Sequence, residues 1–153
     1  MGMTRVKLID GMNFVGAGES NHAVIMDTVA KVGGDDSAPR PVELMLIALG
    51  GCSKSLFGYY TPRGGCTGMD TISILRKMQT IPTEFSIELE DERAAEHPKV
   101  LTRLRLVYRF KGDLPEENVK KAIELSINRY CPITNMINKV AEVSWEYVIE
   151  TDQ

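Results

Sequence analysis

The chain has 153 residues, of which 43% are hydrophobic and 25% are charged, a mixture typical of a single globular domain rather than a disordered chain. Its 18 lysine and arginine residues against 21 aspartate and glutamate residues give a formal net charge of −3, which argues against nucleic acid as a partner. No apolar run approaches the roughly 20 residues that span a bilayer, so no membrane partner is expected. The N-terminus carries no apolar signal core and the three cysteines are widely spaced, so we expect a cytoplasmic protein with reduced thiols.

The first third of the chain predicts a small sheet followed by a buried helix. Short β-like runs over residues 5–9, 13–16 and 22–26, separated by turn residues, are typical of an antiparallel meander. The glycine- and proline-rich turn that follows predicts a helix start at residues 39–41, with Ser37 as a candidate N-cap. Residues 42–49 are apolar on nearly every side, which indicates a helix at the centre of the core.

The rest of the chain alternates between helices and strands after a run of helix breakers over residues 57–65. In order, the patterns predict a helix over 67–79, strands over 83–90 and 100–110, a helix from 114 that Pro132 interrupts, a short helical piece over 134–140 and a strand over 143–150. In the first of these helices, Met69, Ile72, Leu75 and Met78 repeat at three-residue steps. The order of the elements indicates an α+β fold.

The three cysteines are the residues best placed for chemistry. A thiol attacks as its thiolate, and a helix N-terminus or a nearby cation lowers the thiol pKa, whereas apolar burial raises it. Cys66 fits the activating case, because it follows two glycines, precedes a predicted helix and has an arginine three residues earlier. Cys52 follows two glycines at the end of the apolar helix, and Cys131 lies between a helix and a proline. A free cysteine is more commonly a small buried hydrophobe, but the repeated Gly-Gly-Cys pattern favours a reactive role.

Leu49-Gly50-Gly51-Cys52 and Tyr130-Cys131-Pro132 are the most specific parts of a pattern that runs in order through almost the whole chain. The other parts of the pattern lie at residues 19–27, 38–44, 66–70, 74–78 and 92–98. Together they resemble the OsmC/Ohr family of osmotically inducible protein C and the organic hydroperoxide resistance proteins, and most closely its OsmC-like branch. On this resemblance, residues 1–153 are interpreted as one OsmC-like domain.

The resemblance implies an α+β fold in which two long central helices lie against curved antiparallel sheets and two copies intertwine into a homodimer. It also implies a peroxidase that reduces organic hydroperoxides in an antioxidant stress response, with no cofactor. In that chemistry a reactive cysteine, here Cys52 or Cys66, becomes a sulfenic acid, and Cys131 condenses with it to a disulfide. A dithiol reductant then restores both thiols.

Residues 53–66 look like an insertion, since deleting them would leave an uninterrupted family pattern. The residues before the insertion nominate Cys52 as the reactive thiol, and the residues after it nominate Cys66. The sequence leaves this choice open, although the pKa argument favours Cys66.

Family peroxidases also orient the reactive thiolate with a glutamate and an arginine. Glu43 is the local candidate for the acid, but it lies nine residues before Cys52, about 13.5 Å along a straight helix and on its opposite side. The N-terminal loop before His22 contains no arginine at the family position, which leaves Arg40 and Arg93 as candidates.

Two other functions compete with peroxide reduction. The missing arginine and the displaced glutamate suit a non-catalytic dimer that binds a lipophilic ligand or senses redox state. Zinc binding by the three cysteines with His22 or His97 is less favoured, because structural zinc sites contain close ligand pairs and none occurs in this sequence. A disulfide between Cys52 and Cys66 is also left open.

Overall fold

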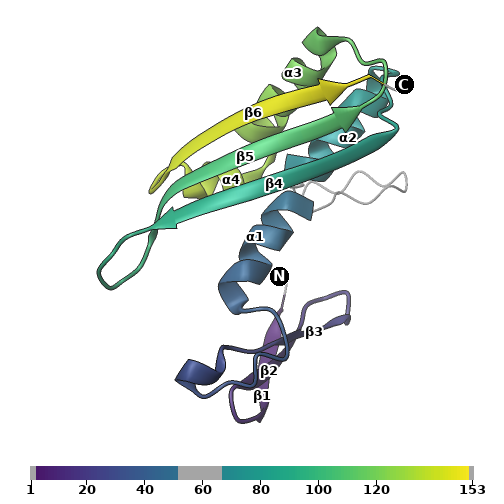
Figure 1. Cartoon of the computed structure of the whole chain (residues 1–153). Helices are drawn as coiled ribbons and strands as arrows, with labels where there is room; N and C mark the ends of the chain where they lie inside the picture. Colours follow the sequence, from purple (N-terminus) through teal and green to yellow (C-terminus); the bar gives the residue numbers. More distant parts are fainter. Residues whose placement is uncertain (1–2, 52–66, 152–153) are drawn as a thin grey trace. The chain divides into compact units, whose positions relative to one another are not determined.

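The computed structural model describes residues 3–51 and 67–151 (Figure 1). Within these residues the chain divides into two compact units, Met1–Leu46 and Ile47–Gln153. In chain order the elements are β1 (Arg5–Asp10), β2 (Asn13–Ala17), β3 (Ala23–Met26), η1 (Ala30–Val32), α1 (Pro41–Gly51), α2 (Thr67–Lys77), β4 (Glu84–Arg93), β5 (Leu101–Lys111), α3 (Glu116–Leu125), η2 (Ser126–Tyr130), α4 (Pro132–Ile137) and β6 (Glu142–Glu150). The predicted α+β class is confirmed.

Strands β1, β2 and β3 form the predicted antiparallel meander in the N-terminal unit. Their register places Val6 beside Gly16 and Gly16 beside Val24, with Leu8, Phe14 and Met26 in the next row on the same face. This face is therefore apolar, yet Val6 is 59% exposed and Leu8 is 49% exposed. We call it the apolar face of the meander.

Asp27 organises the loop between the meander and α1. Its side chain is buried and accepts hydrogen bonds from the backbone N–H groups of Thr28 (2.7 Å), Asp35 (3.0 Å) and Ser37 (3.0 Å). The Ser37 hydroxyl donates a further bond of 2.9 Å to the same carboxylate. Gly34 is packed so closely in this loop that a methyl group on it would lie 2.0 Å from the Thr28 carbonyl oxygen. One carboxylate thus accepts three backbone N–H groups and one hydroxyl of the loop.

Helix α1 begins at Pro41, within the predicted start at residues 39–41, but its cap differs from the sequence prediction. Ser37 was the candidate cap, but its hydroxyl donates to Asp27 and to Asn13, and the helix begins four residues later at Pro41. Glu43 takes the capping role: its carboxylate accepts the Arg40 backbone N–H at 3.0 Å, as the acidic member of a capping box does.

Helix α1 also differs in its burial. The apolar sequence predicts a helix at the centre of the core, but only Leu49 is buried, whereas Ile47 is 61% exposed and Val42 and Met45 are exposed too. The predicted burial of this helix is therefore wrong for all its residues except Leu49.

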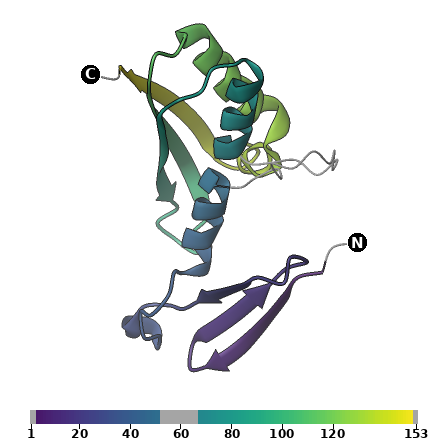
Figure 2. The same ribbon diagram turned by 90° about the vertical axis from the view of Figure 1, so that its right-hand side faces the viewer.

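In the C-terminal unit the strands are ordered β4-β5-β6, and helices α2 and α3 cover one face of this sheet (Figures 1 and 2). The expected antiparallel pairing holds for β4 and β5, but β5 and β6 are parallel, because the chain crosses back through α3, η2 and α4 before β6. The buried core lies between the sheet and the helices and includes Leu75, Leu104, Leu106, Tyr108, Phe110, Val119 and Ile123.

The opposite face of this sheet carries paired charges. Arg105 contacts both Glu90 (2.9 Å) and Glu146 (2.6 Å), and Arg109 contacts Glu88 (2.9 Å). The hydrogen bond from Arg109 holds the pKa of the Glu88 carboxyl below its ordinary value. These pairs are exposed, and exposed ion pairs add little to stability, so this face is a solvated surface as the alternating sequence predicts.

We expect Asp27→Asn to destabilise the protein at neutral pH and to flatten the dependence of its stability on pH. Hydrogen bonding, first from the Ser37 backbone N–H, lowers the pKa of the Asp27 carboxyl from 3.8 to about 2. Because the folded-state pKa lies below the unfolded one, the carboxylate contributes its full stability above about pH 4, and this contribution is lost as the pH falls through about 2. Urea midpoints measured from pH 2 to pH 7 test this.

Asp36→Asn is the matched control, because Asp36 is an exposed neighbour in the same loop. It should retain the wild-type slope of stability against pH. An Asp27→Asn variant with the wild-type slope between pH 2 and pH 4 would contradict the assignment.

Candidate active site

Cys131 is fully buried at the junction of η2 and α4. Its sulfur accepts hydrogen bonds from the Thr134 backbone N–H (3.3 Å) and from the Thr134 hydroxyl (3.0 Å). The other two cysteines singled out in the sequence, Cys52 and Cys66, lie outside the described residues. The proposed pairing of either one with Cys131 therefore stays a prediction.

The backbone at Cys131 is held by a π-helical turn that the sequence did not predict. Across this turn the Cys131 N–H donates to the Ser126 carbonyl oxygen at 2.8 Å. The Asn135 side-chain amide then donates to the carbonyl oxygens of Cys131 (2.8 Å) and Ile127 (3.1 Å). Single π-helical turns occur frequently at functional sites, and here the turn fixes where the thiol lies.

A group of buried hydroxyls surrounds the first residue of α2. The Thr67 hydroxyl makes a short hydrogen bond with the Tyr108 hydroxyl. The Ser126 hydroxyl donates to the Thr67 carbonyl oxygen at 3.0 Å, and the Thr71 hydroxyl donates to the same oxygen at 2.7 Å. We call these four residues, Thr67, Thr71, Tyr108 and Ser126, the hydroxyl cluster; each is buried.

Burial raises the pKa of Tyr108 well above its ordinary value. The hydrogen bond to Thr67 opposes this rise in the pKa, and the charge of Cys131 adds to it. Tyr108 is therefore a neutral hydroxyl at physiological pH.

The buried side of α2 is polar, in contrast to the sequence pattern. Thr67, Gly68, Thr71 and Leu75 are buried, whereas Met69 is exposed. Of the repeat Met69, Ile72, Leu75 and Met78, only Leu75 is buried. The side of α2 that carries Thr67 faces the sheet and η2 instead, because Tyr108 and Ser126 offer hydroxyl partners there.

The end of α1 and the start of α2 meet through two glycines. A methyl group on Gly68 would lie 2.1 Å from the Gly50 carbonyl oxygen, and a methyl group on Gly50 would lie 3.0 Å from the Leu89 side chain. Only a glycine at position 68 permits the Gly50 carbonyl to approach this closely. The chain therefore leaves the described structure after Gly51 and returns at Thr67 close to the same point.

Glu43 and the two candidate arginines form local ion pairs. Glu43 contacts the Arg40 guanidinium at 3.3 Å in addition to capping the Arg40 N–H, and both side chains are about half exposed. Arg93 instead pairs with Asp91 at 2.7 Å. Of the two candidates, only Arg40 is joined to Glu43.

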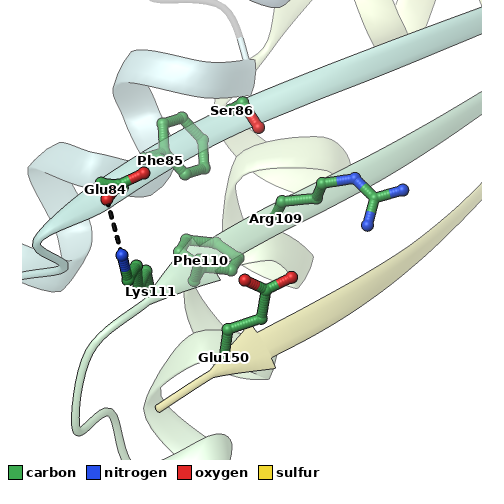
Figure 3. A pocket seen from close by; sticks show the side chains of 7 residues that line it. All are labelled: Glu84, Phe85, Ser86, Arg109, Phe110, Lys111 and Glu150. Carbon is green, nitrogen blue, oxygen red and sulfur yellow. Dashed lines mark hydrogen bonds and ion pairs between the residues drawn. The ribbon is translucent and has the colours of Figure 1, made fainter. Parts of the chain in front are cut away.

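A hollow at one end of the β4-β5-β6 sheet is unrelated to these groups (Figure 3). Its lining consists of Glu84, Phe85, Ser86, Arg109, Phe110, Lys111 and Glu150. None of these belongs to the hydroxyl cluster or contacts Cys131 in the bonds described above. Across residues 3–51 and 67–151, no three histidine, cysteine or acidic side chains come together as metal ligands. None of the helices in these residues has the length and hydropathy of a membrane span.

The chain is similar to known proteins over most of its length. The family model for OsmC-like proteins matches residues 34–146, which include parts of both compact units. Protein YhfA of Escherichia coli strain K12 is 31% identical over 146 residues, covering 95% of this chain and 96% of YhfA.

Solved structures share the fold at lower identity. An OsmC-like protein from Mycoplasma pneumoniae has a TM-score of 0.76 at 10% identity, covering 98% of this chain and 97% of that one. An organic hydroperoxide resistance protein OsmC from Legionella pneumophila has a TM-score of 0.62 at 15% identity, covering 95% of this chain and 96% of that one.

We expect Gly68→Ala to destabilise the protein by about 1–3 kcal/mol, the usual cost of forcing extra volume into a packed site. The reason is the backbone carbonyl that the new methyl would meet at 2.1 Å. Thermal unfolding at fixed protein concentration measures the effect. Gly51→Ala is the control, because no atom of residues 3–51 or 67–151 lies within 4 Å of a methyl group there. Similar unfolding temperatures for the two variants would show that the glycine contact is not tight.

Proposed function

Because the chain belongs to the OsmC-like protein family, we propose that it is a thiol-dependent peroxidase that reduces organic hydroperoxides. The observation that carries this proposal is the buried Cys131 beside the first residue of α2. Ser126 bonds to both residues: its hydroxyl donates to the Thr67 carbonyl oxygen, and its carbonyl oxygen accepts the Cys131 N–H. Cys66 directly precedes Thr67 in the sequence, and Cys52 directly follows Gly51 at the end of α1.

The proposed reaction has three steps. The thiolate of the reactive cysteine attacks the hydroperoxide, and with one proton this gives an alcohol and a cysteine sulfenic acid. The Cys131 thiol then displaces the sulfenic hydroxyl, which forms the disulfide and releases water that carries the thiol proton. A dithiol transfers two electrons to the disulfide by thiol exchange and restores both cysteines. These steps need reduced resting thiols, so we place the protein in the cytoplasm.

A homodimer is part of the proposal. The apolar face of the meander and the exposed apolar side chains of α1 need a cover, because a three-stranded sheet is stable only when its hydrophobic face is packed. A second copy of the chain presents the same two surfaces, and a symmetric pair of chains would bury both at once.

A second candidate function is a non-catalytic dimer that binds a lipophilic ligand or senses redox state. The contacts of Glu43 favour it. Both carboxylate oxygens of Glu43 are engaged by Arg40 at the start of α1, one in the helix cap and one in the ion pair. This acid is thus used for local structure, whereas the family peroxidases use an acid to orient the thiolate.

Cysteine variants test the peroxidase. With dithiothreitol as reductant, we expect wild-type protein to consume cumene hydroperoxide and Cys66→Ser to lower the rate to the uncatalysed background, because the nucleophile is gone. Cys131→Ser should still react once and leave a sulfenic acid that dimedone traps. A loss confined to Cys52→Ser would make Cys52 the reactive thiol.

Wild-type rates for both Cys52→Ser and Cys66→Ser would exclude the peroxidase. Absence of dimedone trapping in all variants, together with saturable binding of a lipophilic probe, would support the second candidate instead. Peptide mapping of the oxidised wild-type protein identifies which cysteine Cys131 has joined.

We expect Leu8→Lys to shift the protein from dimer to monomer, because the charge would lie on the apolar face of the meander. Sedimentation equilibrium at several concentrations measures the mass. Lys7→Glu is the control: Lys7 is on the same strand but points to the opposite face, so this variant should remain a dimer. A wild-type monomer at about 100 µM would overturn the dimer, since stable homodimers have affinities far tighter than this.

A further inference from the structure

No residue of the hydroxyl cluster supplies a reacting group in the proposed reaction. All four residues are buried in the C-terminal unit. Burying a hydroxyl costs free energy unless it is hydrogen-bonded, and apolar side chains fill the neighbouring inward positions of β5, Leu106 and Phe110. Tyr108 places a hydroxyl in this row, and the hydroxyl meets Thr67. The hydroxyl groups of the cluster thus all bond to or belong to Thr67, the first residue of α2.

Ser126 extends this contact to the thiol. Its side chain donates to the Thr67 carbonyl oxygen at 3.0 Å and lies 3.2 Å from the Thr67 hydroxyl. Its own carbonyl oxygen accepts the Cys131 N–H at 2.8 Å. Ser126 therefore holds the start of α2 with one group and the backbone of Cys131 with another.

The sheet side of the cluster is linked to Cys131 through hydrogen bonds. The Tyr108 hydroxyl bonds to Thr67, and Ser126 joins Thr67 to the Cys131 N–H. Thr67 is bonded from the sheet by Tyr108 and from the π-helical turn by Ser126, so its position is fixed from two sides relative to Cys131. A helix end held only by apolar contacts would have more freedom to move along its neighbours.

We propose that Thr67, Tyr108 and Ser126 are positioning residues that hold the start of α2 beside Cys131 for disulfide formation. The proposal rests on the proposed function and concerns its second step. In that step the Cys131 sulfur forms a bond to the sulfenic sulfur, the S–O bond breaks, and the hydroxyl leaves as water with the thiol proton. No other oxidant or reductant enters, because the hydroperoxide has already supplied the oxidation.

The effect is specific to one step. Attack on the hydroperoxide involves a single cysteine and the substrate, whereas disulfide formation needs two sulfurs in contact. A displacement of about 1 Å between reacting groups can cost on the order of 100-fold in rate. Loosening Thr67 should therefore slow disulfide formation and leave the first oxidation nearly unchanged.

Thr67→Val and Thr67→Ser form the central test, because valine keeps the shape and removes the hydroxyl, whereas serine keeps the hydroxyl. After one equivalent of cumene hydroperoxide, acid quenching and mass spectrometry follow the sulfenic acid and the disulfide over time. We expect Thr67→Val to form sulfenic acid at the wild-type rate and the disulfide about 10- to 100-fold more slowly. Thr67→Ser should restore the wild-type rate of disulfide formation.

Tyr108→Phe provides a second variant from another element and should show the same slow step. Tyr147→Phe is its matched control, since the Tyr147 hydroxyl of the neighbouring strand bonds to Glu116 and not to the cluster. With excess hydroperoxide, the long-lived sulfenic acid in Thr67→Val and Tyr108→Phe should react again and give a sulfinic acid and an alcohol. Tyr147→Phe should give no more sulfinic acid than the wild type.

The outcomes separate the two proposals. If the wild-type protein forms the disulfide and both Thr67→Val and Tyr108→Phe form it equally fast, the positioning role is wrong and the peroxidase stands. If both steps slow together in folded variants, or if Thr67→Ser fails to recover the rate, the cluster has only a general structural role. If the wild-type protein forms no sulfenic acid with cumene hydroperoxide, the proposed function fails and the positioning role with it.

Discussion

The bonding of Thr67 is the constraint on which the C-terminal unit depends. Helix α2, strand β5 and the π-helical turn come from separate parts of the chain, and each supplies a group to this one residue or its carbonyl. Apolar contacts between helices and sheets tolerate small shifts, but a buried polar group that loses its partner carries a desolvation cost of about 1–3 kcal/mol. The cluster therefore selects one register of α2 on the sheet. The contact between Gly50 and Gly68 also constrains the position of α2, because the two backbones can approach this closely only where both residues lack a side chain.

The N-terminal unit lacks such a closed core. Asp27 fixes its loop with hydrogen bonds, but the hydrophobic effect is proportional to the apolar area removed from water, and the meander leaves that area open on one face. Helix α1 has the same deficit. The proposed homodimer would remove this deficit, since a second copy of the chain could cover both surfaces by symmetry.

The sequence predicts those elements whose patterns are local. Strands β4, β5 and β6 alternate with period two, and the stripe of Val119, Ala122 and Ile123 marks the buried side of α3. The parallel pairing of β6, the π-helical turn and the polar buried side of α2 could not be predicted in this way, because each depends on partners distant in the sequence. The exposure of α1 could not be predicted for a related reason: an apolar helix indicates burial, but the apolar pattern does not identify the surface that would cover it.

The candidate site shows the same division. Glu43 looked like a functional acid because of its place near the start of the apolar helix, but its contacts reach only three residues back and are those of any capping glutamate. Cys131 differs in its backbone bond: its N–H donates to the Ser126 carbonyl oxygen, and Ser126 connects it to a helix that begins 64 residues earlier in the chain. Local contacts of an exposed residue arise wherever a helix starts. The Cys131 sulfur itself accepts only the local capping bonds of Thr134, so what supports the proposed redox function is the link from the Cys131 backbone through Ser126 to Thr67, the residue that follows Cys66 in the sequence.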